Sequence, residues 1–544
     1  MQKFSVSGNI TDIVNERIFS GTIHIENGKI ASVIEEADKT YSNYILPGFV
    51  DAHVHIESSM LIPSEFARMA VAHGTVATVS DPHEIANVLG IEGVRYMINN
   101  GKKVPFKFCF AAPSCVPATP FETAGAEISA TDIEELFEKD GLTYLSELMN
   151  YPGVIYKFPE VIEKLEVAKK YNKRIDGHAP GLIGPDIEIY AGAGISTDHE
   201  CVDYNEALEK IRLGIKILIR EGSAAKNFDA LHLLLKTHPD HCMFCSDDKH
   251  PDDLLVGHIN QAVKRALALG YPLMDVLKAA IKNPIDHYDL DVGMLRLGDS
   301  ADFIEVNNLK DFKILKTYVT GELVAENGIS KIKSVAAETP NNFKAEKKTV
   351  EDFHLAPQAD LVRVIKVSDG QLLTKAVISL AKVENGNTVS DTENDILKAA
   401  VVNRYRNTPP ALGFIQNFKL KSGAIASSVG HDSHNIIAVG TSDEEICAAV
   451  NAVIEEKGGM VVANKGNIKS LPLPVAGLMT TADGYETADK YSELSAAAKA
   501  LGSDLNAPFM TLSFMALLVI PQIKLSDKGL FNGDKFEFVD VFVK

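Results

Sequence analysis

Apolar and polar positions alternate along residues 1–45, and the dipeptide Asn27-Gly28 interrupts the alternation within GTIHIENGKIASVIEE. A period of two is typical of strands, and Asn-Gly is a preferred two-residue hairpin turn. The same strand-and-turn pattern returns at residues 290–335, in GMLRLGDSADFIEV and KILKTYVTGELVAENG. We therefore expect residues 1–45 and 290–335 to pair into one small β domain.

Residues 46–289 follow a different pattern, in which a short apolar run precedes a stretch with helical periodicity. This unit occurs eight times, with the apolar runs in FVDAHVH, TVATVSDP, KFCFAAP, YLSEL, RIDGHAP, ISTDHE, KILIREGS and CMFCSDD. Eight strand–helix units over this length are typical of a TIM-like (β/α)₈ barrel. A doubly wound open sheet is the alternative, and the count of eight argues against it only moderately.

Residues 331–357 are polar and lack apolar periodicity, so we interpret them as a linker. The region that follows, 358–544, mixes strand-like segments such as GAIASSVGHDSHNIIAVG with the helical DEEICAAVNAVIEEKGG. Its apolar run at 509–521 is too short to span a bilayer, and it could form a subunit contact or pack in the core. The predicted fold class is α/β: a barrel, a small β domain from both of its flanks, and a C-terminal mixed α/β domain.

Composition narrows the classes of function. Asp and Glu number 73 against 54 Lys and Arg, giving a formal net charge of −19. This excess repels nucleic acids and anionic membranes, so neither is expected as a partner. Six cysteines are too few for a secreted disulfide framework, and the opening MQKFSVSGNITDIVNERIFSG has no apolar signal-peptide core. We therefore expect a cytoplasmic protein.

Histidines and carboxylates gather at the carboxyl ends of the predicted barrel strands. His53 and His55 are two apart on the first strand, so their side chains share one face. Strands four, five, six and eight add four more potential ligands: Glu147, His178, His199 and Asp247. Barrel active sites lie at this end of the strands. The joint pattern favours a metal centre over the alternative that these residues only form hydrogen bonds at the rim.

Six ligands exceed the needs of one catalytic ion, which uses about three protein ligands plus water. Two ions use the whole set: His53, His55 and Asp247 on one, His178 and His199 on the other, and Glu147 between them. A water held between the ions would lose a proton near neutral pH, and Asp247 could shuttle that proton with its second oxygen. Imidazole and carboxylate ligands admit zinc, iron and manganese alike.

The segment PGFVDAHVHIESSM resembles the signature of the amidohydrolase superfamily. Its extension, together with SDPHEIANV, SELMNYPGV, DGHAPG, STDHE, REGSA, SDDKHPDDL and ASSVGHDSHNIIAVG, resembles the microbial adenine deaminases in motif order. The resemblance implies a distorted barrel, two manganese or iron ions on the six residues above, and hydrolysis of free adenine to hypoxanthine and ammonia in purine salvage. Many amidohydrolases carry a carboxylated lysine on strand four. No lysine stands beside Glu147, and a glutamate there is the pattern of the adenine deaminases.

Residues for substrate contact follow strands one, two and seven. His83 and Glu84 could protonate a ring nitrogen of a purine as hydroxide attacks C6, which makes that carbon more electrophilic. The alternative is that they only start a helix, where a glutamate favours the helix dipole. We take Glu84 with Asp247 as catalytic candidates. The remaining substrate-binding candidates are Glu57, Ser58, His83, Arg220 and Ser223, and a surface-loop role is equally open for the last two.

The motif HDSHN at 431–435 lies outside the barrel, and its spacing assigns it no role. It could reach over the barrel mouth, bind a further ion or organise a turn, and we favour a loop that approaches the active site. Cys242 and Cys245 form a CxxC without a second such pair, so we expect buried strand residues rather than a zinc or redox site. The other histidines of the barrel region are expected to be solvated: His232, His238, His241, His258 and His287.

Two alternatives to adenine deamination remain open. The first is another amidohydrolase that acts on a different heterocycle or a cyclic amide, because the same metal centre would serve it. The second is a non-catalytic metal-containing scaffold, whose mark would be the loss of a ligand, and all six are present. A homo-oligomer is expected, of unspecified size.

Overall fold

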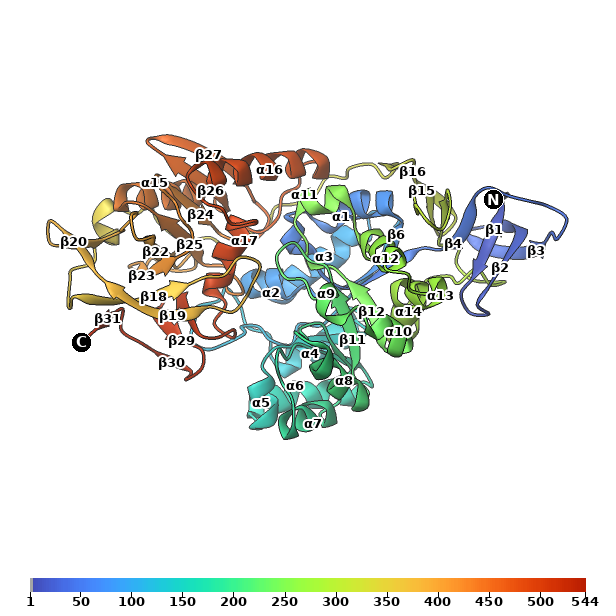
Figure 1. Ribbon diagram of the computed structural model, residues 1–544, viewed down its shortest axis with the longest axis horizontal. Coiled ribbons are helices and arrows are strands. Elements are labelled where there is room, and N and C mark those ends of the chain that lie inside the picture. Colours follow the sequence, from blue (N-terminus) through green and yellow to red (C-terminus); the bar gives the residue numbers. More distant parts are fainter. Residues whose placement is uncertain (1–2) are drawn as a thin grey trace.

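The computed structural model describes residues 3–544 as an elongated molecule with three regions along its length (Figure 1). A small sheet with the N-terminus lies at one end, the barrel lies in the middle, and a C-terminal region with its own sheet lies at the other end. Over residues 3–544, no helix combines the length and the apolar character needed to cross a membrane.

The small sheet contains strands from both flanks of the barrel, in the order β17-β16-β15-β14-β4-β1-β2-β3. Its strands are β1 (Lys3–Asp12), β2 (Arg17–Glu26), β3 (Lys29–Glu35), β4 (Tyr44–Pro47), β14 (Phe303–Val306), β15 (Ile314–Val319), β16 (Glu322–Glu326) and β17 (Ile329–Ser330). β4 joins the flanks, because it pairs in parallel with β1 and antiparallel with β14. Asn27 and Gly28 form the two-residue turn between β2 and β3, both with positive φ (53° and 76°), so the predicted hairpin is confirmed.

The barrel consists of eight consecutive parallel strand segments in the predicted places. They are β5 (Phe49–His55), β6 (Thr75–Ser80), β7 (Lys107–Phe110), β8 (Tyr144–Leu148), β9 (Arg174–Gly177), β10 (Thr197–Asp198), β11 (Lys216–Arg220) and β12 (Cys242–Cys245), which continues as β13 (Asp247–Asp248). Parallel bridges Ala112–Leu145 and Ile175–Ile195 join the sheet fragments, and β13 pairs with β5. The ring therefore closes, which confirms the barrel and excludes the open doubly wound sheet.

Helices surround the barrel and cover the outer face of its strands (Figure 1). They are α1 (Pro63–Ala70), α2 (His83–Leu89), α3 (Ile91–Gly101), α4 (Ala130–Lys139), α5 (Tyr151–Ile155), α6 (Pro159–Lys170), α7 (Pro185–Gly192), α8 (Tyr204–Arg212), α9 (Phe228–Leu231), α10 (Leu234–Thr237), α11 (Pro251–Val256), α12 (Ile259–Ala268), α13 (Leu273–Leu277), a π-helical turn at Lys278–Lys282 and α14 (Asn283–Tyr288). Cys242 and Cys245 are buried in β12, as expected.

The C-terminal region contains a mixed sheet in the order β19-β18-β23-β22-β25-β24-β26-β27, with β31 beside β18. Its strands are β18 (Leu361–Lys366), β19 (Lys375–Leu380), β22 (Ile396–Val402), β23 (Ala411–Gln416), β24 (Ala424–Ser427), β25 (Ile436–Gly440), β26 (Gly459–Asn464), β27 (Asn467–Pro472) and β31 (Phe542–Val543). Shorter pairs and helices complete it: β20 (Lys382–Glu384), β21 (Asn387–Val389), β28 (Ile523–Ser526), β29 (Gly529–Asn532), β30 (Glu537–Phe538), α15 (Asp443–Glu455), α16 (Gly484–Ala500) and α17 (Pro508–Ser513).

Polar contacts join the C-terminal region to the barrel. Arg68 of α1 pairs with Asp483 (Nη1–Oδ2 2.8 Å), and the Tyr491 hydroxyl contacts His250 Nδ1 at 2.6 Å. The expected linker also takes part, since Asn342 donates to the Val88 carbonyl oxygen at 3.3 Å. Asn341 of the linker also donates to the Lys457 carbonyl oxygen of the C-terminal region at 2.7 Å, so the polar linker bonds to both neighbours.

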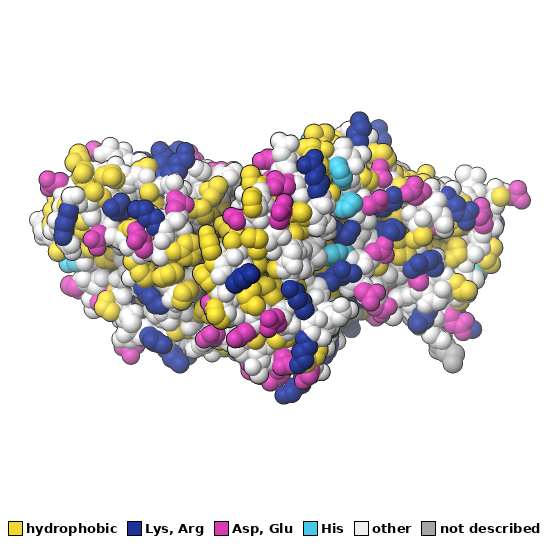
Figure 2. All heavy atoms as spheres, turned by 90° about the horizontal axis from the view of Figure 1, so that it is seen from below, with side chains coloured by type: hydrophobic (Ala, Val, Ile, Leu, Met, Phe, Trp, Pro, Cys, Tyr) yellow, Lys and Arg dark blue, Asp and Glu magenta, His cyan; other side chains and the backbone are white. Residues whose placement is uncertain are grey.

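The apolar run at 509–521 packs inside the chain. Phe509, Leu512 and Phe514 are buried, and the run continues from α17 toward the barrel mouth. Of the two interpretations left open by the sequence, the structure supports core packing. On the face drawn in Figure 2, acidic and basic side chains are interspersed, so this face carries no single sign of charge.

Candidate metal centre and substrate pocket

Three predicted ligands meet at the end of β5. Alternation along the strand places His53 and His55 on one face, and their Nε2 atoms are 3.1 Å apart. Asp247 lies beside them because β13 pairs with β5, with Asp247 opposite Val54. Its Oδ1 is 3.5 Å from His53 Nε2 and 3.2 Å from His55 Nε2. These three donor atoms therefore surround one point.

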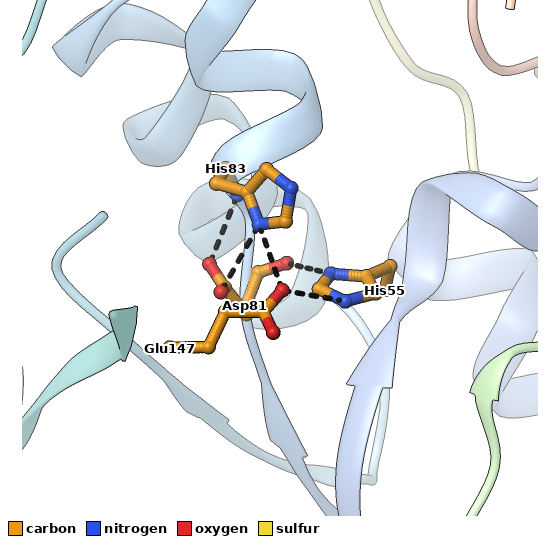
Figure 3. Close-up of side chains that lie close together, drawn as sticks. All are labelled: His55, Asp81, His83 and Glu147. Carbon is orange, nitrogen blue, oxygen red and sulfur yellow. Dashed lines mark hydrogen bonds and ion pairs between the residues drawn. The ribbon is translucent and has the colours of Figure 1, made fainter. Parts of the chain in front are cut away.

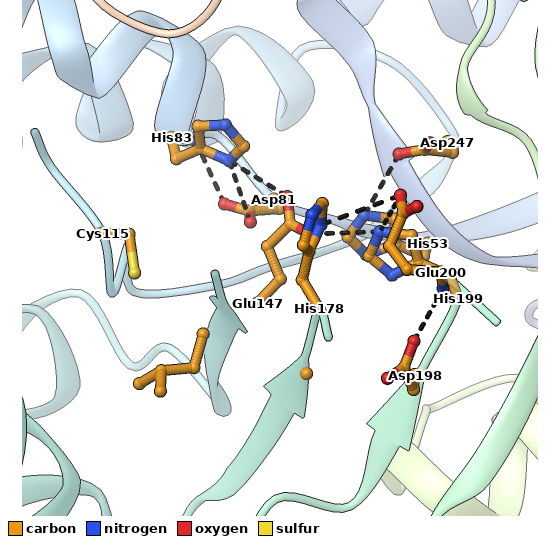
Figure 4. Close-up of polar contacts among 12 residues, drawn as sticks. His53, Asp81, His83, Cys115, Glu147, His178, Asp198, His199, Glu200 and Asp247 are labelled. Atoms are coloured by element: carbon orange, nitrogen blue, oxygen red, sulfur yellow. Dashed lines mark hydrogen bonds and ion pairs between the residues drawn. The ribbon is translucent and has the colours of Figure 1, made fainter. Parts of the chain in front are cut away.

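Glu147 of β8 connects this group to the other two histidines (Figure 4). Its Oε1 lies 3.2 Å from His55 Nε2. Its Oε2 lies 2.8 Å from His178 Nδ1 and 3.1 Å from His199 Nε2. The two oxygens of one carboxylate thus face two separate groups of imidazole nitrogens, and the structure brings all six predicted ligands together.

The donor set fits two divalent cations. Neutral imidazole nitrogens that face each other at 3.1 Å, as His53 and His55 do, repel unless a proton or a cation lies between them. Imidazole nitrogens mixed with carboxylate oxygens are typical ligands for zinc, iron and manganese. His53, His55 and Asp247 would hold one cation and His178 and His199 the other, with Glu147 shared.

Charge within the cluster favours cation binding. Burial lowers the pKa of His199, but the charge and hydrogen bond of Glu147 outweigh burial and raise that pKa to about 9. Burial raises the pKa of Asp247, but Arg220 and the neighbouring histidines hold it well below its usual value. The carboxylates therefore stay ionised, and the metal-free cluster would bind protons that a cation must displace.

Arg220 is buried beside the cluster and is no surface-loop residue. Its Nη1 donates to Asp247 Oδ2 at 2.7 Å, and its Nη2 donates to Glu200 Oε2 at 3.1 Å. The second oxygen of Asp247 is thereby held in place. Sequence reasoning missed Glu200, although it directly follows the ligand His199 in the motif STDHE.

His83 and Glu84 begin α2 and also face the cluster. His83 Nδ1 is 3.1 Å from Asp81 Oδ2 and 3.7 Å from Glu147 Oε1 (Figure 3). Glu84 is buried, and its two oxygens contact His431 Nδ1 and His434 Nε2 of the C-terminal region. Both residues therefore start a helix and line the site, so the two interpretations are compatible.

The HDSHN motif lies on the loop between β24 and β25 and reaches over the barrel mouth. Besides the contacts of His431 and His434 with Glu84, its Asp432 Oδ1 lies 3.7 Å from His83 Nε2. Tyr405 holds the loop by donating to the Ser433 carbonyl oxygen at 2.6 Å. The loop approaches the candidate active site, which is the role we favoured.

Three substrate-binding candidates lie behind the residues that line the cavity. Glu57 Oε1 accepts from the Ile85 N–H at 3.1 Å, and burial raises the Glu57 pKa to about 7. Ser58 Oγ donates to Asp248 Oδ1 at 2.5 Å, and Ser223 Oγ accepts from the His250 N–H at 2.8 Å. In this structure these side chains support neighbouring segments instead of facing the cluster.

The expectation of solvated histidines is wrong for two of the five. His258 is 3% exposed and His287 is 6% exposed. His258 Nε2 lies 2.7 Å from Asp51 Oδ2, and its Nδ1 lies 2.7 Å from Thr75 Oγ1. The helical periodicity of the sequence places His258 next to the start of a helix. It does not show that His258 packs against the barrel strands.

A cavity of about 30 Å³ lies between the cluster and the C-terminal region. Barrel residues and C-terminal residues both line it, namely His55, His83, Glu84, Glu147, Met149, His178, His199, Glu200, Arg220, Ala225, Asp247, Asp248, Leu372, His431, Asp432, Phe514 and Leu517. Most of the polar lining comes from the barrel, with His431 and Asp432 added by the C-terminal region, and most of the apolar lining comes from the C-terminal region.

The closed barrel with ligands at its strand ends defines the class of protein. Residues 44–324 match the sequence profile described as "Amidohydrolase family". Since the match covers more than half of the chain, the chain is an amidohydrolase.

Residues 371–537 match a second profile, "Adenine deaminase C-terminal domain". Three relatives named adenine deaminase match nearly the whole chain. The protein of Methanosarcina mazei is 54% identical (98% of this chain, 99% of the relative), that of Salinibacter ruber 53% (99% and 99%), and that of Borreliella burgdorferi 50% (99% and 100%). The chain therefore belongs to the adenine deaminase family of amidohydrolases.

Proposed function

We propose that this chain hydrolyses free adenine to hypoxanthine and ammonia. The observation that supports this most directly is the cluster in which Glu147 faces His55 with one oxygen and His178 and His199 with the other. The relatives named adenine deaminase, up to 54% identical over nearly the full chain, point to adenine as the substrate. The reaction would return adenine to nucleotide metabolism as hypoxanthine.

Two divalent cations, when bound by the six ligands, would acidify a water molecule and so supply the nucleophile for attack at C6 of adenine. Asp247 is proposed to accept the proton of that water and pass it to the departing amino group. Arg220 holds Asp247 Oδ2 at 2.7 Å, so the carboxylate is already oriented when substrate arrives. The C6–O bond forms, the C6–N bond breaks, and the amino group leaves as ammonia.

Glu84 is proposed to deliver a proton to a ring nitrogen beside C6. Burial raises the Glu84 pKa, but His431, His434 and His83 outweigh burial and hold it well below its usual value. Glu84 is therefore a carboxylate before substrate reacts, and the proton that it relays is stored on the imidazole of His431, whose own pKa is raised because Glu84 and Asp248 outweigh the effect of burial. Protonation of the ring makes C6 more electrophilic. The ring nitrogen keeps this proton in hypoxanthine, and the proton of the C6 hydroxyl passes to Glu84 as the carbonyl forms and ammonia leaves.

Purified protein supplied with manganese or iron tests this function directly. We expect adenine to disappear while hypoxanthine and ammonia appear in equal amounts. Turnover of a dihydropyrimidine without turnover of adenine would favour the alternative amidohydrolase function. Turnover of neither substrate by fully metal-loaded protein would favour a non-catalytic scaffold.

Asp247→Ala tests the proton-transfer step. We expect turnover to fall by about 10²–10⁴-fold with the fold retained, because the variant removes both a ligand and the proton carrier. Circular dichroism and metal analysis should accompany the rate measurement. An active variant would remove Asp247 from the mechanism.

We further propose that the cations are manganese or iron, that the protein is cytoplasmic, and that it is a homo-oligomer. The first point rests on the resemblance to the adenine deaminases, since the ligands also suit zinc. Elemental analysis of the active protein and light scattering would test the metal and the oligomeric state. One cation for each chain in a fully active preparation would contradict the two-ion centre.

A further inference from the structure

The cavity at the metal cluster is closed to a purine in this structure. Its volume of about 30 Å³ leaves room for only a few water molecules. Adenine, a fused two-ring base, is several times larger, and pockets for small-molecule ligands usually enclose roughly 300–1,000 Å³. Part of the cavity wall must therefore move before a base can reach the ligands.

A second and larger cavity, which we name the antechamber, lies between the barrel and the C-terminal region. Its volume is about 610 Å³. It is open to solvent, because several residues that line it are exposed, among them Lys226, Ser492, Ala496 and Lys499. Its carboxylates and ammonium groups are those of Asp252, Asp253, Asp369, Lys226 and Lys499. Since the carboxylates outnumber the ammonium groups, this lining does not attract phosphate anions.

The antechamber and the cavity at the metal cluster share a wall. Ala224 lines the antechamber and the next residue, Ala225, lines the cavity at the cluster. Three further segments line both spaces in the same way, through His250 and Asp248, Gly370 and Leu372, and Thr511 and Phe514. Where the two alanines meet, the wall is a single layer of backbone. They belong to the loop 221–226, which we name the gate loop.

The gate loop has fixed ends and one tie in its middle. The Arg220 N–H donates to Asn227 Oδ1 at 2.7 Å, and the Asn227 N–H donates to the Arg220 carbonyl oxygen at 3.1 Å. In the middle, the Ser223 N–H donates to the Asp248 carbonyl oxygen at 2.8 Å, and Ser223 Oγ accepts from the His250 N–H at 2.8 Å. The residues around Ser223 are glycine and alanine, so opening of the loop exposes little apolar surface. A short loop held in this way can open while its ends stay in place.

We propose that the antechamber is the route of the purine from solvent, and that the gate loop moves aside to admit the base to the metal cluster. This inference rests on the proposed deamination of adenine. The antechamber favours an uncharged base over a phosphate-bearing nucleotide, because its lining is net acidic. Return of the gate loop would hold the base beside the ligands during the reaction.

The test plugs the antechamber from its solvent side. Ala496 of α16 is exposed and lines the antechamber, whereas Glu493 of the same helix is exposed and does not line it. Ala496→Cys and the control Glu493→Cys are blocked with thiol reagents of increasing size, which a reductant removes again. Stopped-flow fluorescence then follows the binding of 2-aminopurine to the metal-loaded proteins. This fluorescent base carries no amino group at C6, so it is not deaminated there.

A plug should slow association and release of the base by the same factor and leave Kd unchanged, because it obstructs the route without altering the site. With the largest reagent on Ala496→Cys we expect a slowing of at least about tenfold. Reduction should restore both rates in the same sample, and blocked Glu493→Cys should keep the rates of the wild type. Unchanged rates in blocked Ala496→Cys, equal slowing in both variants, or a changed Kd at unchanged rates would overturn the inference.

The gate loop is tested by the rate at which iodoacetamide alkylates Ala225→Cys, read by peptide mass spectrometry. This thiol would line the closed cavity, so alkylation requires an open loop. Adding Ser223→Ala removes the acceptor for the His250 N–H and should raise the rate about 2–10-fold, whereas Ser223→Thr keeps the hydroxyl and should not. Equal rates in all three proteins would overturn the gating role. Alkylation needs no purine, so failure of the wild type to turn over adenine would overturn the proposed function separately.

Discussion

At the scale of single residues, the centre depends on one carboxylate. Glu147 supplies an oxygen to each group of imidazoles, at 3.2 Å from His55 Nε2 and 2.8 Å from His178 Nδ1. Histidine could not replace it, because an imidazole presents its two nitrogens in divergent directions on a rigid ring. The side chain that is buried on β8 thus determines whether two cations can be held close together.

Glu147→Gln should abolish the shared ligand. An amide offers one oxygen for coordination, so we expect bound metal to fall from two ions to at most one and turnover to fall by about 10³-fold or more. Elemental analysis after gel filtration gives the stoichiometry. Glu305→Gln, at another buried carboxylate in the small sheet, should change neither quantity. Full occupancy of two ions in the Glu147 variant would contradict a bridging role.

The convergence of the six candidate ligands could be predicted from the sequence because each residue follows or ends an apolar run of a strand. Glu200, Asp81 and Asp248 lie within two residues of predicted site residues and line or support the site, yet no periodicity distinguishes them from ordinary loop residues. The side-chain directions of His83 and Glu57, which are both near the rim, depend on packing: one faces the cluster and the other faces the backbone of α2.

At the scale of elements, helix α8 supports the second pair of histidines. Lys210 of this helix is fully buried, and its Nζ donates to Asp198 Oδ2 at 2.8 Å and to the Ala179 carbonyl oxygen at 2.6 Å. Asp198 precedes His199, and Ala179 follows His178. One side chain therefore orders the ends of β9 and β10 together.

Lys210→Met should weaken the cation site formed by His178 and His199 while leaving the site on β5 less affected. Loss of such a supporting contact costs about 10–100-fold in metal affinity. Titration of the metal-free protein with manganese, followed by calorimetry, should show one weakened and one nearly unchanged site. Equal weakening of both sites would indicate general destabilisation of the protein. Lys398→Met removes a buried lysine of the C-terminal sheet and serves as the control for that effect.

Strand β28 places a buried lysine beneath the apolar cover of the cavity. Lys524 Nζ contacts the carbonyl oxygens of Leu372 at 2.7 Å and Phe514 at 3.0 Å, and burial lowers its pKa to about 7. An unfolded lysine has a pKa of about 10.4, so the folded state binds this proton less tightly. The contribution of Lys524 to the free energy of unfolding is therefore fully present above the unfolded pKa. It is lost as the pH falls through about 7, because protonation then favours the unfolded chain.

Wild-type Tm should therefore rise relative to that of Lys524→Met as pH increases from 6 to 10. The variant also lacks the two hydrogen bonds of Lys524, but this loss is the same at every pH. The change of the Tm difference with pH therefore reports only the titration of Lys524. Differential scanning calorimetry across this range gives the measurement. A difference in Tm that stays flat with pH would place the Lys524 pKa at its ordinary value.

At the scale of the whole molecule, the six candidate ligands come from strands all around the barrel. They come from β5, β8, β13 and the residues after β9 and β10, so bound cations would tie together strands around the ring. Chelation should therefore lower Tm by several degrees and abolish turnover, and manganese or iron should restore both. Calcium, which prefers oxygen ligands, serves as the control and should restore neither.

Metal affinity should also depend on pH. Because the His199 pKa is raised to about 9 in the absence of metal, protons compete with the cation, and the affinity should rise as pH increases toward 9. The cation titration at several pH values measures this. An affinity independent of pH between 6 and 9 would contradict the protonated state of the metal-free cluster.

The sequence alone determined the barrel strands, the hairpin at Asn27-Gly28 and the convergence of the six candidate ligands, because each depends on local alternation or on a position at a strand end. Only the tertiary structure decided how the C-terminal region acts: the loop with His431, Asp432 and His434 contacts His83 and Glu84, more than 340 residues earlier in the chain. Contacts over such a separation depend on how two independently formed sheets pack together. No local pattern of apolar and polar residues encodes that packing.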